Sequence, residues 1–297
     1  MMNMRNFLIV MISFLGSLAI YAQPNLLNAK IPEEIGLKSD AQLISDNDKP
    51  LEYGYVDDRD VLMGKTVWEI IDLSERINFP LYFPIDTANI GSDRRSLYDV
   101  LTRAIRSGEI SEVYSDSYFN TKKSYKDIQA SLTRIDTTDA GKEQINAGIA
   151  ISPEYIVKQD LTSQDVTQYK IKGYWYFDKR QSELKYRLLG ICPVTPDVYT
   201  MNSDEKDYIE LFWVFFPSSR DVLHEAKAFN DKNSAMPISF DQILNSRRFN
   251  AVIYQEENVY GDRTIVSYMK DNAQNQLLEA ERVKEKIRDF EENMWNY

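Results

Sequence analysis

The stretch LEYGYVDDRDVLMGKTVWEIIDLSERINFPLYFPID, residues 51–86, joins an acidic start, a dense apolar middle and an aromatic end that contains proline. Asp57 and Asp58 lie where a helix N-terminus favours negative charge. The apolar residues behind them are too many for a narrow stripe: Val61, Leu62, Val67, Trp68, Ile70 and Ile71. Pro80 and Pro84 are typical of a helix end. The stretch therefore predicts a largely buried core helix with an extended, aromatic exit.

The N-terminus has the order of a secretory signal peptide. Arg5 precedes an apolar run at residues 7–18, and small residues follow near Ala22. The run is shorter than the ~20 residues of a membrane span, and no cysteine follows it, so no lipid anchor is expected. We predict a signal peptide at residues 1–22, an extended arm at 23–50 and one α+β domain at 51–297. A subdivision of that domain near residue 160 stays open.

Charge and cysteine content narrow the function classes. The formal net charge is −11, and without Arg5 the remaining 34 Lys and Arg face 46 Asp and Glu, a net charge near −12. An acidic chain disfavours nucleic acids and anionic lipid surfaces. Cys192 is the single cysteine, which excludes an intrachain disulfide. With one histidine, His224, far away in sequence, we interpret Cys192 as a small buried residue of a strand and not as a nucleophile.

Local signals predict most of the other elements. Ser96 and Asp99 form a capping box, apolar residues repeat at helical spacing from Leu97 to Ile105, and Gly108 stops that helix. A second box, Ser239 to Gln242, begins another helix. Further helices are expected at 124–135 and 220–229, with a short helix or turn at 160–162. Strands are expected at 110–114, 169–177, 184–194, 208–216 and 249–254, with 169–177 and 184–194 forming an antiparallel hairpin around a charged turn.

Two halves of the chain share an order of elements. In each half an aromatic residue and a proline, Phe79-Pro80 or Phe216-Pro217, precede a Ser-capped helix and then a short strand ending in tyrosine. This order suggests an internal duplication, although few positions are identical.

The chain closes with a helix predicted at residues 272–293. Its apolar stripe recurs at spacings of three and four: Ala280, Val283, Ile287, Phe290 and Met294. The other faces are charged, so the stripe should pack on an apolar surface. Two surfaces remain as candidates for this contact: the chain's own domain and a partner subunit.

Catalytic motifs are scarce. The sequence has no Gly-rich phosphate loop, no GxSxG motif and no EF-hand pattern, and one His with one Cys cannot build a zinc site. We therefore expect no enzyme, metal or cofactor. The alternative is a periplasmic carbohydrate-binding protein or a carboxylate-based glycoside hydrolase. It would use the cluster Asp57, Asp58 and Asp60 and an aromatic platform of Trp175, Tyr176 and Trp213.

Several long blocks together carry a family resemblance. They are EYGYVDDRDVLMGKTVWEIIDLSERINFPLYFPID, RRSLYDVL, GYWYFDKRQSELKYRLLGICPVTPD, LNSRRFNAVIYQEENVYGDR and FEENMWNY. Over essentially the whole chain the sequence resembles the GldN (PorN) family of the Bacteroidota type IX secretion and gliding-motility machinery. The resemblance implies a non-enzymatic subunit in the periplasm, at the inner face of the outer membrane.

The resemblance also implies partners. They are a GldK/PorK-like outer-membrane lipoprotein, further copies of the same chain in a ring, and the GldM/PorM-like periplasmic domains of an inner-membrane motor complex. The fold expected is α+β, with a small antiparallel sheet flanked by helices, an extended N-terminal arm and a long C-terminal helix. We place candidate subunit contacts at the two chain ends: Leu26, Leu27, Val283, Ile287, Phe290, Met294 and Trp295.

Overall fold

The computed structural model describes residue 31 and residues 48–86, 94–124, 126–128, 133–148, 153–196, 207–230, 238–270 and 272–294. The predicted signal peptide, all but a few residues of the predicted arm, and the contact candidates Leu26, Leu27 and Trp295 lie outside these ranges. The chain divides into residues 1–49 and 50–297, and the second unit is described below.

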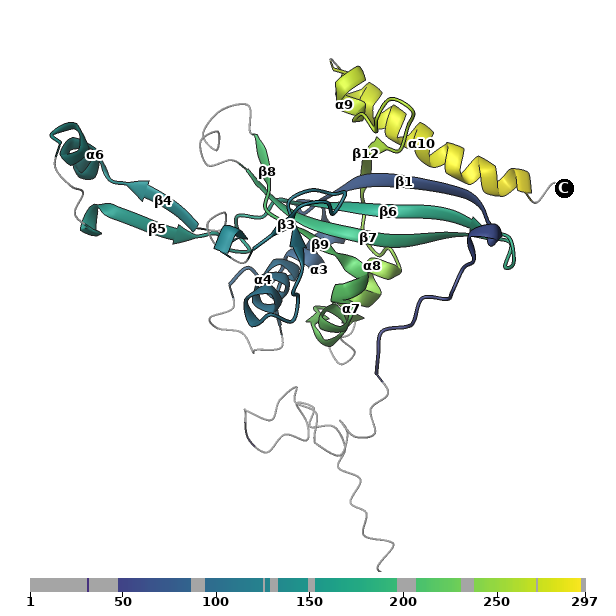
Figure 1. Cartoon of the computed structure of the whole chain (residues 1–297), viewed down its shortest axis with the longest axis horizontal. Coiled ribbons are helices and arrows are strands. Elements are labelled where there is room, and N and C mark those ends of the chain that lie inside the picture. Colours follow the sequence, from purple (N-terminus) through teal and green to yellow (C-terminus); the bar gives the residue numbers. More distant parts are fainter. Residues whose placement is uncertain are drawn as a thin grey trace, which may run out of the picture. The chain divides into compact units, whose positions relative to one another are not determined.

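An antiparallel sheet of eight strands organises this unit (Figure 1). Its order is β12-β1-β6-β7-β9-β2-β3, and β8 pairs with the end of β7 beside this path. The strands are β1 (Val61–Asp72), β2 (Val113–Tyr114), β3 (Lys122–Lys123), β6 (Gln168–Asp178), β7 (Glu183–Pro196), β8 (Tyr208–Glu210), β9 (Trp213–Phe215) and β12 (Val252–Glu256). With the flanking helices this sheet confirms the predicted α+β class.

The opening stretch forms a strand, so its predicted core helix is wrong. Val67, Glu69 and Ile71 face one side of β1 and Trp68 the other, and all four are buried. Because β1 pairs with both β6 and β12 and both of its faces are covered, its apolar run is nearly continuous, a pattern that a buried helix shares. Asp57 instead caps a short 3-10 turn, η2 (Asp58–Asp60).

The predicted exit of that stretch is also wrong. After β1 the chain forms the 3-10 turn η3 (Arg76–Asn78) and the short helix α3 (Phe79–Tyr82), with Pro80 in its first turn. Proline is accepted there because the first helical N–H groups need no intrahelical acceptor.

The central hairpin is confirmed. β6 and β7 pair from Gln168↔Val194 to Asp178↔Glu183 around the predicted charged turn. The strand expected at 208–216 is divided into β8 and β9, and Phe216 already begins α7 (Phe216–Glu225). The helix predicted at 220–229 thus starts and ends four residues earlier. Residues near the end of the predicted range form β10 (Lys227–Ala228) instead, and this strand pairs with β11 (Ile238–Ser239).

Both Ser-capped helices are confirmed. Ser96 Oγ accepts a hydrogen bond from Asp99 N at 3.3 Å and begins α4 (Leu97–Ser107), and Gly108 ends it at a φ of 85°. Ser239 Oγ accepts from Gln242 N at 3.1 Å and begins α8 (Phe240–Asn245). Satisfying these N–H groups fixes where each helix starts.

The two halves of the chain exchange strands. Each half opens with a strand (β1 or β9), continues through a helix that begins at Phe-Pro (α3 or α7) and a Ser-capped helix (α4 or α8), and closes with a strand (β2 or β12). The closing strand of each half pairs antiparallel with the opening strand of the other, and the β6–β7 hairpin lies between the pairs. The predicted order of elements is thus present twice, although β12 continues two residues past Tyr254.

A separate hairpin follows the β2–β3 region. β4 (Thr133–Thr137) pairs with β5 (Ile156–Asp160), and α6 (Asp139–Asn146) and the 3-10 turn η4 (Pro153–Tyr155) connect them. The helix predicted at 124–135 is wrong at its end, because residues 133–135 belong to β4. Among its described residues only 126–128 are helical.

Three apolar clusters hold the unit together. The largest packs α4, α7 and α8 on β6 and β7, as Figure 1 shows. The second packs α9 (Ile265–Tyr268) and α10 (Ala273–Met294) on β1 and β12, which confirms the predicted C-terminal helix. The third, on the opposite face, contains Trp68, Tyr114, Cys192, Val194 and Trp213.

Candidate interaction surface

The predicted contact stripe of the C-terminal helix faces the chain's own core. Val283 and Ile287 are buried with Ala280 against Val67 and Ile253. The half-buried Phe290 lies edge-on to Phe177, with 6.1 Å between ring centroids. Met294 is also half-buried. These side chains hold α10 in place, so a partner would have to use the other faces of that helix.

The acidic cluster of the hydrolase alternative serves local structure. Asp57 Oδ1 accepts from the backbone N–H of Arg59 at 3.1 Å, and the carboxylate also accepts from the Arg59 guanidinium. These bonds lower the pKa of Asp57. Asp60 lies 3.7 Å from the guanidinium of Arg180. A general acid needs a raised pKa at pH 7, and the Asp57 environment acts in the other direction.

The proposed aromatic sugar platform is contradicted. Trp213 is fully buried and donates from Nε1 to Glu210 Oε2 at 2.7 Å. Tyr176 is buried, and Trp175 packs against Tyr186 with 5.0 Å between ring centroids. Because β6 and β9 are interior strands, Trp175 and Trp213 belong to the apolar clusters on the sheet. Tyr176 lies against Tyr174 and Arg187.

Cys192 and His224 lie in different elements, β7 and α7. Cys192 is fully buried in β7, and burial raises the pKa of its thiol well above the usual value. A thiol with a raised pKa is a poor nucleophile, in agreement with the structural interpretation. His224 lies in the last turn of α7.

A buried ion pair links the two clusters on the helical face. Arg247, just after α8, donates from Nη1 and Nη2 to the carboxylate of Glu69 in β1 at 2.8 and 2.9 Å. Tyr186 Oη donates to the same carboxylate at 3.3 Å, and the guanidinium lies 4.1 Å from the Tyr186 ring centroid. Burial and the neighbouring Glu69 raise the pKa of Tyr186 well above 10. Since every member has a partner, the cluster is structural.

Tyr53 fixes the point where the chain enters the sheet unit. Its ring lies between two guanidinium groups, 4.2 Å from Arg220 and 4.5 Å from Arg187, measured to the ring centroid. Its hydroxyl donates to Asn245 Oδ1 at 2.7 Å, and Arg187 donates to the carbonyl of Gly54 at 3.2 Å. Arg220 is itself held by a buried pair with Asp241. The N-terminal segment is thereby fastened to β7, α7 and α8.

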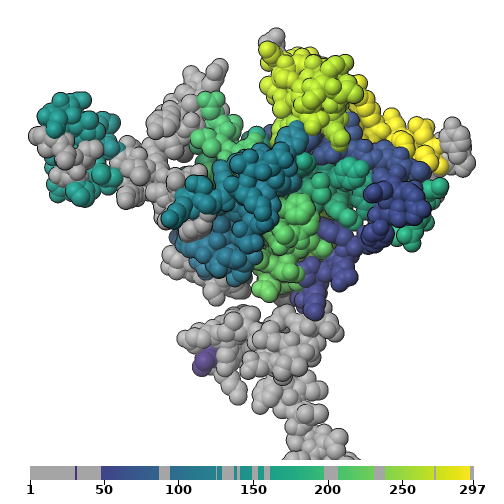
Figure 2. Space-filling view, in the orientation of Figure 1, coloured from purple at the N-terminus to yellow at the C-terminus, as the bar shows by residue number. Residues whose placement is uncertain are grey.

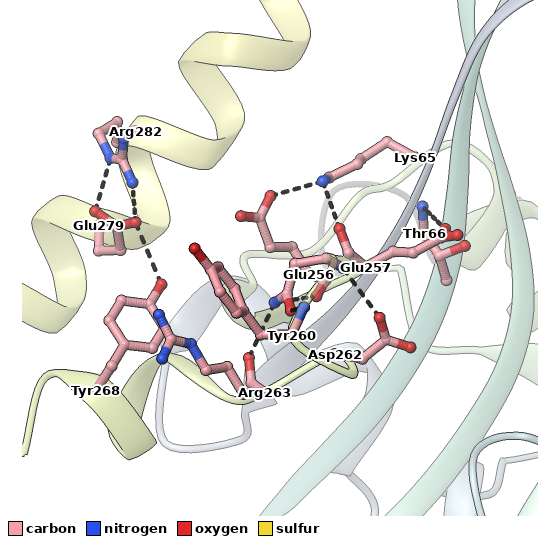
Figure 3. Close-up of polar contacts among 11 residues, drawn as sticks. Lys65, Thr66, Glu256, Glu257, Tyr260, Asp262, Arg263, Tyr268, Glu279 and Arg282 are labelled. Carbon is pink, nitrogen blue, oxygen red and sulfur yellow. Dashed lines mark hydrogen bonds and ion pairs between the residues drawn. The ribbon is translucent and has the colours of Figure 1, made fainter.

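The loop between β12 and α9 is held by hydrogen bonds within the loop and from neighbouring residues; Figure 3 shows part of this set. Asp262, with a φ of 57°, accepts from Asn258 N at 3.0 Å and from Tyr118 Oη at 3.1 Å. Its carbonyl accepts from Gln255 Nε2 at 2.6 Å. These bonds close a tight turn, so that the side chains of the loop are presented in one arrangement.

Arg263 lies near the end of this loop, two residues before α9. Its guanidinium lies 4.5 Å from the ring centroid of Tyr260 and 4.6 Å from that of Tyr268. Tyr268 Oη donates to Glu279 Oε1 at 3.2 Å, and Arg282 also donates to that carboxylate. The bond from Arg282 lowers the pKa of Glu279 despite partial burial. Tyr268 is thus fixed to α10, and it fixes one side of Arg263 in turn.

A second group of bonds joins the loop to β1. Lys65 Nζ lies 3.0 Å from a Glu256 carboxylate oxygen and donates to the carbonyl of Glu257 at 2.6 Å. The Glu257 carboxylate accepts from the backbone N–H of Thr66 at 3.2 Å. Figure 3 shows these groups converging on the loop from β1, β12 and α10. Three elements therefore support one exposed turn.

Apolar side chains are exposed on the same loop as Arg263 and on the helices α9 and α10 that follow it. Val259 is 93% exposed and Tyr260 70% exposed, and Val266, Leu277 and Leu278 each expose more than half of their area. Figure 2 shows the yellow-green segment that contains α9 and the start of α10 on the outside of the molecule. We call this set the tyrosine–arginine surface: Val259, Tyr260, Arg263, Val266, Leu277 and Leu278. Tyrosine and arginine on a preorganised loop are typical of the residues that dominate protein interfaces.

Sequence reasoning did not identify this surface. The block that contains EENVYGDR carries part of the family resemblance, but its pattern alone does not predict which side chains support Arg263. One local signal was available, because Val259 and Tyr260 directly precede Gly261-Asp262, where a turn exposes them. The contacts from Tyr118 and Glu279 depend on tertiary structure and leave no local pattern.

Two further observations limit the site's chemistry. Within the described ranges, no group of three or more His, Cys, Asp or Glu side chains could hold a metal ion. None of the helices in that part of the chain has the length and apolar character that crossing a bilayer requires.

Fold and surface together define an α+β protein that carries exposed aromatic, apolar and charged side chains on a loop fixed by hydrogen bonds. Residues 56–296 match the family model described as gliding motility associated protein GldN, and the chain belongs to that family. A search of curated proteins gave no match. Membership supports a component of the gliding motility and type IX secretion machinery.

Proposed function

We propose that the chain is a non-enzymatic structural subunit of the type IX secretion machinery in the periplasm. It forms a ring with a GldK/PorK-like outer-membrane lipoprotein and contacts the GldM/PorM-like domains of the motor complex. The observation that carries this proposal is the family match, which extends over residues 56–296 and so includes nearly all of the sheet unit. The N-terminal signal pattern and the acidic, disulfide-free composition support an exported scaffold.

The polar clusters agree with a scaffold. The buried carboxylates Glu69 and Asp241 each bind an arginine in two places, and Asp241 also accepts from Asn245. Such pairs fix the relative positions of strands and helices. The exposed aromatic and apolar residues on a rigid loop supply the kind of surface that a subunit needs.

Isolation from native membranes tests this function. We expect a tagged full chain, expressed from its own locus, to co-purify from outer-membrane extracts with a lipoprotein, in ring-shaped particles seen by negative-stain electron microscopy. An untagged strain is the control. Recovery of the tagged chain as a monomer, without a lipoprotein, would contradict the proposal.

Particle yield and glycan cleavage by an Asp58→Asn variant test the hydrolase alternative. Asp58→Asn should leave particle yield unchanged, because Asp58 is exposed in the η2 turn. If the purified chain cleaved glycans and Asp58→Asn abolished cleavage, the enzymatic reading would replace the scaffold.

A further inference from the structure

The tyrosine–arginine surface holds a cation that has no acidic partner among the described residues. Arg263 is exposed, and its guanidinium contacts the rings of Tyr260 and Tyr268. Stacking on aromatic faces leaves the N–H groups at the edge of a guanidinium available to a carboxylate. The surface therefore fits a segment that presents a carboxylate beside apolar side chains.

The same chain presents such a segment at its entry to the sheet. Leu51 is 85% exposed and Tyr55 83% exposed, and the exposed carboxylate of Glu52 lies between them in sequence. Tyr53 fixes this segment to Arg187 and Arg220. Its apolar side chains are therefore held at the surface instead of being free to reach another part of their own chain.

We propose that the tyrosine–arginine surface of one copy binds residues 51–55 of a second copy. Arg263 receives the Glu52 carboxylate, and Val259, Tyr260, Leu277 and Leu278 cover Leu51 and Tyr55. The inference rests on the proposed ring, because it names the contact between neighbouring copies.

The difference between the two surfaces suits a ring. One is built on the β12–α9 loop and α10, and the other lies before β1 and is fixed to α7 and α8. Since the two surfaces differ, the contact is heterologous and can repeat from copy to copy. Both surfaces are also preorganised, the first by the hydrogen bonds of the β12–α9 loop and the second by Tyr53. Preorganisation lowers the entropic cost of association.

Charge exchange between copies tests the pairing. Arg263→Glu and Glu52→Arg should each lower the yield of multi-copy particles by about tenfold or more, because each places like charges together. The double variant Arg263→Glu/Glu52→Arg should recover most of the yield. The matched control is Arg106→Glu with Glu109→Lys, two exposed residues at the end of α4. Its yield should remain that of the unmodified chain.

Cross-linking supplies a second measurement on the full chain in native membranes. Val259→Cys combined with Leu51→Cys should give a ladder of disulfide-linked multimers on oxidation. Each single variant should give at most dimers. The buried Cys192 contributes no background, and Val259→Cys with Ile77→Cys is the control pair, since Ile77 is 56% exposed elsewhere in the fold.

The outcomes separate this contact from the proposed function. Rings that persist in the Arg263→Glu variant, with no ladder from the paired cysteines, would overturn the contact and leave the ring intact. Loss of rings that the double variant does not restore, again without a ladder, would assign Arg263 to a different partner, the lipoprotein or the motor domain. Failure of the unmodified chain to give particles at all would contradict the proposed function itself.

Discussion

Glu69 and Arg247 are 178 residues apart in sequence and meet in a two-point ion pair. The carboxylate is almost completely buried, and Arg247 adopts a φ of 51°. Its guanidinium also lies over the rings of Tyr186, Trp175 and Phe249. Removing one member would leave the other charge buried without compensation, whereas removing both would not.

Arg247→Met should therefore lower the free energy of unfolding by about 3 to 5 kcal/mol, the usual cost of breaking a buried pair. The double variant Glu69→Met/Arg247→Met should lose less than Arg247→Met alone. Urea denaturation followed by tryptophan fluorescence measures both. A loss below about 1 kcal/mol for the single variant would show that water replaces the arginine.

Buried tyrosines predict a loss of stability at alkaline pH. Burial raises the pKa of Tyr169, Tyr186 and Tyr254 above 10 in the folded chain. Above about pH 10 the unfolded chain releases these protons while the folded chain keeps them, so the free energy of unfolding falls as pH rises. Each tyrosine adds a slope of about 1.4 kcal/mol per pH unit. Urea titrations between pH 8 and 11 measure this slope. Tyr169→Phe should make the slope less steep by the contribution of one tyrosine.

At the scale of elements, α10 is held by one face only. Ala280, Val283 and Ile287 are buried against β1 and β12, while Leu277 and Leu278 on another face are exposed. One helix thus closes the second apolar cluster and forms one side of the tyrosine–arginine surface. The inner and outer faces can be tested separately.

Ile287→Ala should cost about 2 to 5 kcal/mol of unfolding free energy, because it opens a cavity beneath the helix. Arg288→Ala, the neighbouring residue with 62% of its side chain exposed, should change stability by less than about 0.5 kcal/mol. Thermal unfolding followed by circular dichroism gives both values. Equal effects would mean that the stripe is not packed on the chain's own sheet.

The elements that sequence predicted correctly are those with local causes. Ser96 and Gly108 mark the ends of α4 through bonds and backbone angles that the neighbouring residues determine, and the charged turn fixes the β6–β7 hairpin. The prediction failed for β1, since its apolar run follows from strands on both sides and not from helical spacing. The Glu69–Arg247 pair and the support of Arg263 by α10 join distant residues, and no local pattern marks such contacts.

At the scale of the whole molecule, the β6–β7 hairpin lies between two exchanged strand pairs, and the largest apolar cluster packs against it. The β4–β5 hairpin, by contrast, is a two-stranded sheet of its own. Two strands are marginally stable by themselves, whereas interior strands open only with the entire fold.

Hydrogen exchange should therefore proceed slowest at the amides of β6 and β7, with protection close to the global free energy of unfolding. The amides of β4 and β5 should exchange at least about tenfold faster. Mass spectrometry of peptides from a full-length sample measures both regions together. Equal protection would show that the small hairpin unfolds only when the large sheet does.

The exchange of closing strands also constrains how the chain is made. β1 emerges early from the ribosome, but its neighbours β6 and β12 follow about a hundred and about a hundred and eighty residues later. Neither half can complete its own sheet, and long-range pairing of this kind is slow. A nascent chain therefore keeps β1 without its second neighbour until residues 252–256 have been synthesised, and the sheet closes only at that late point.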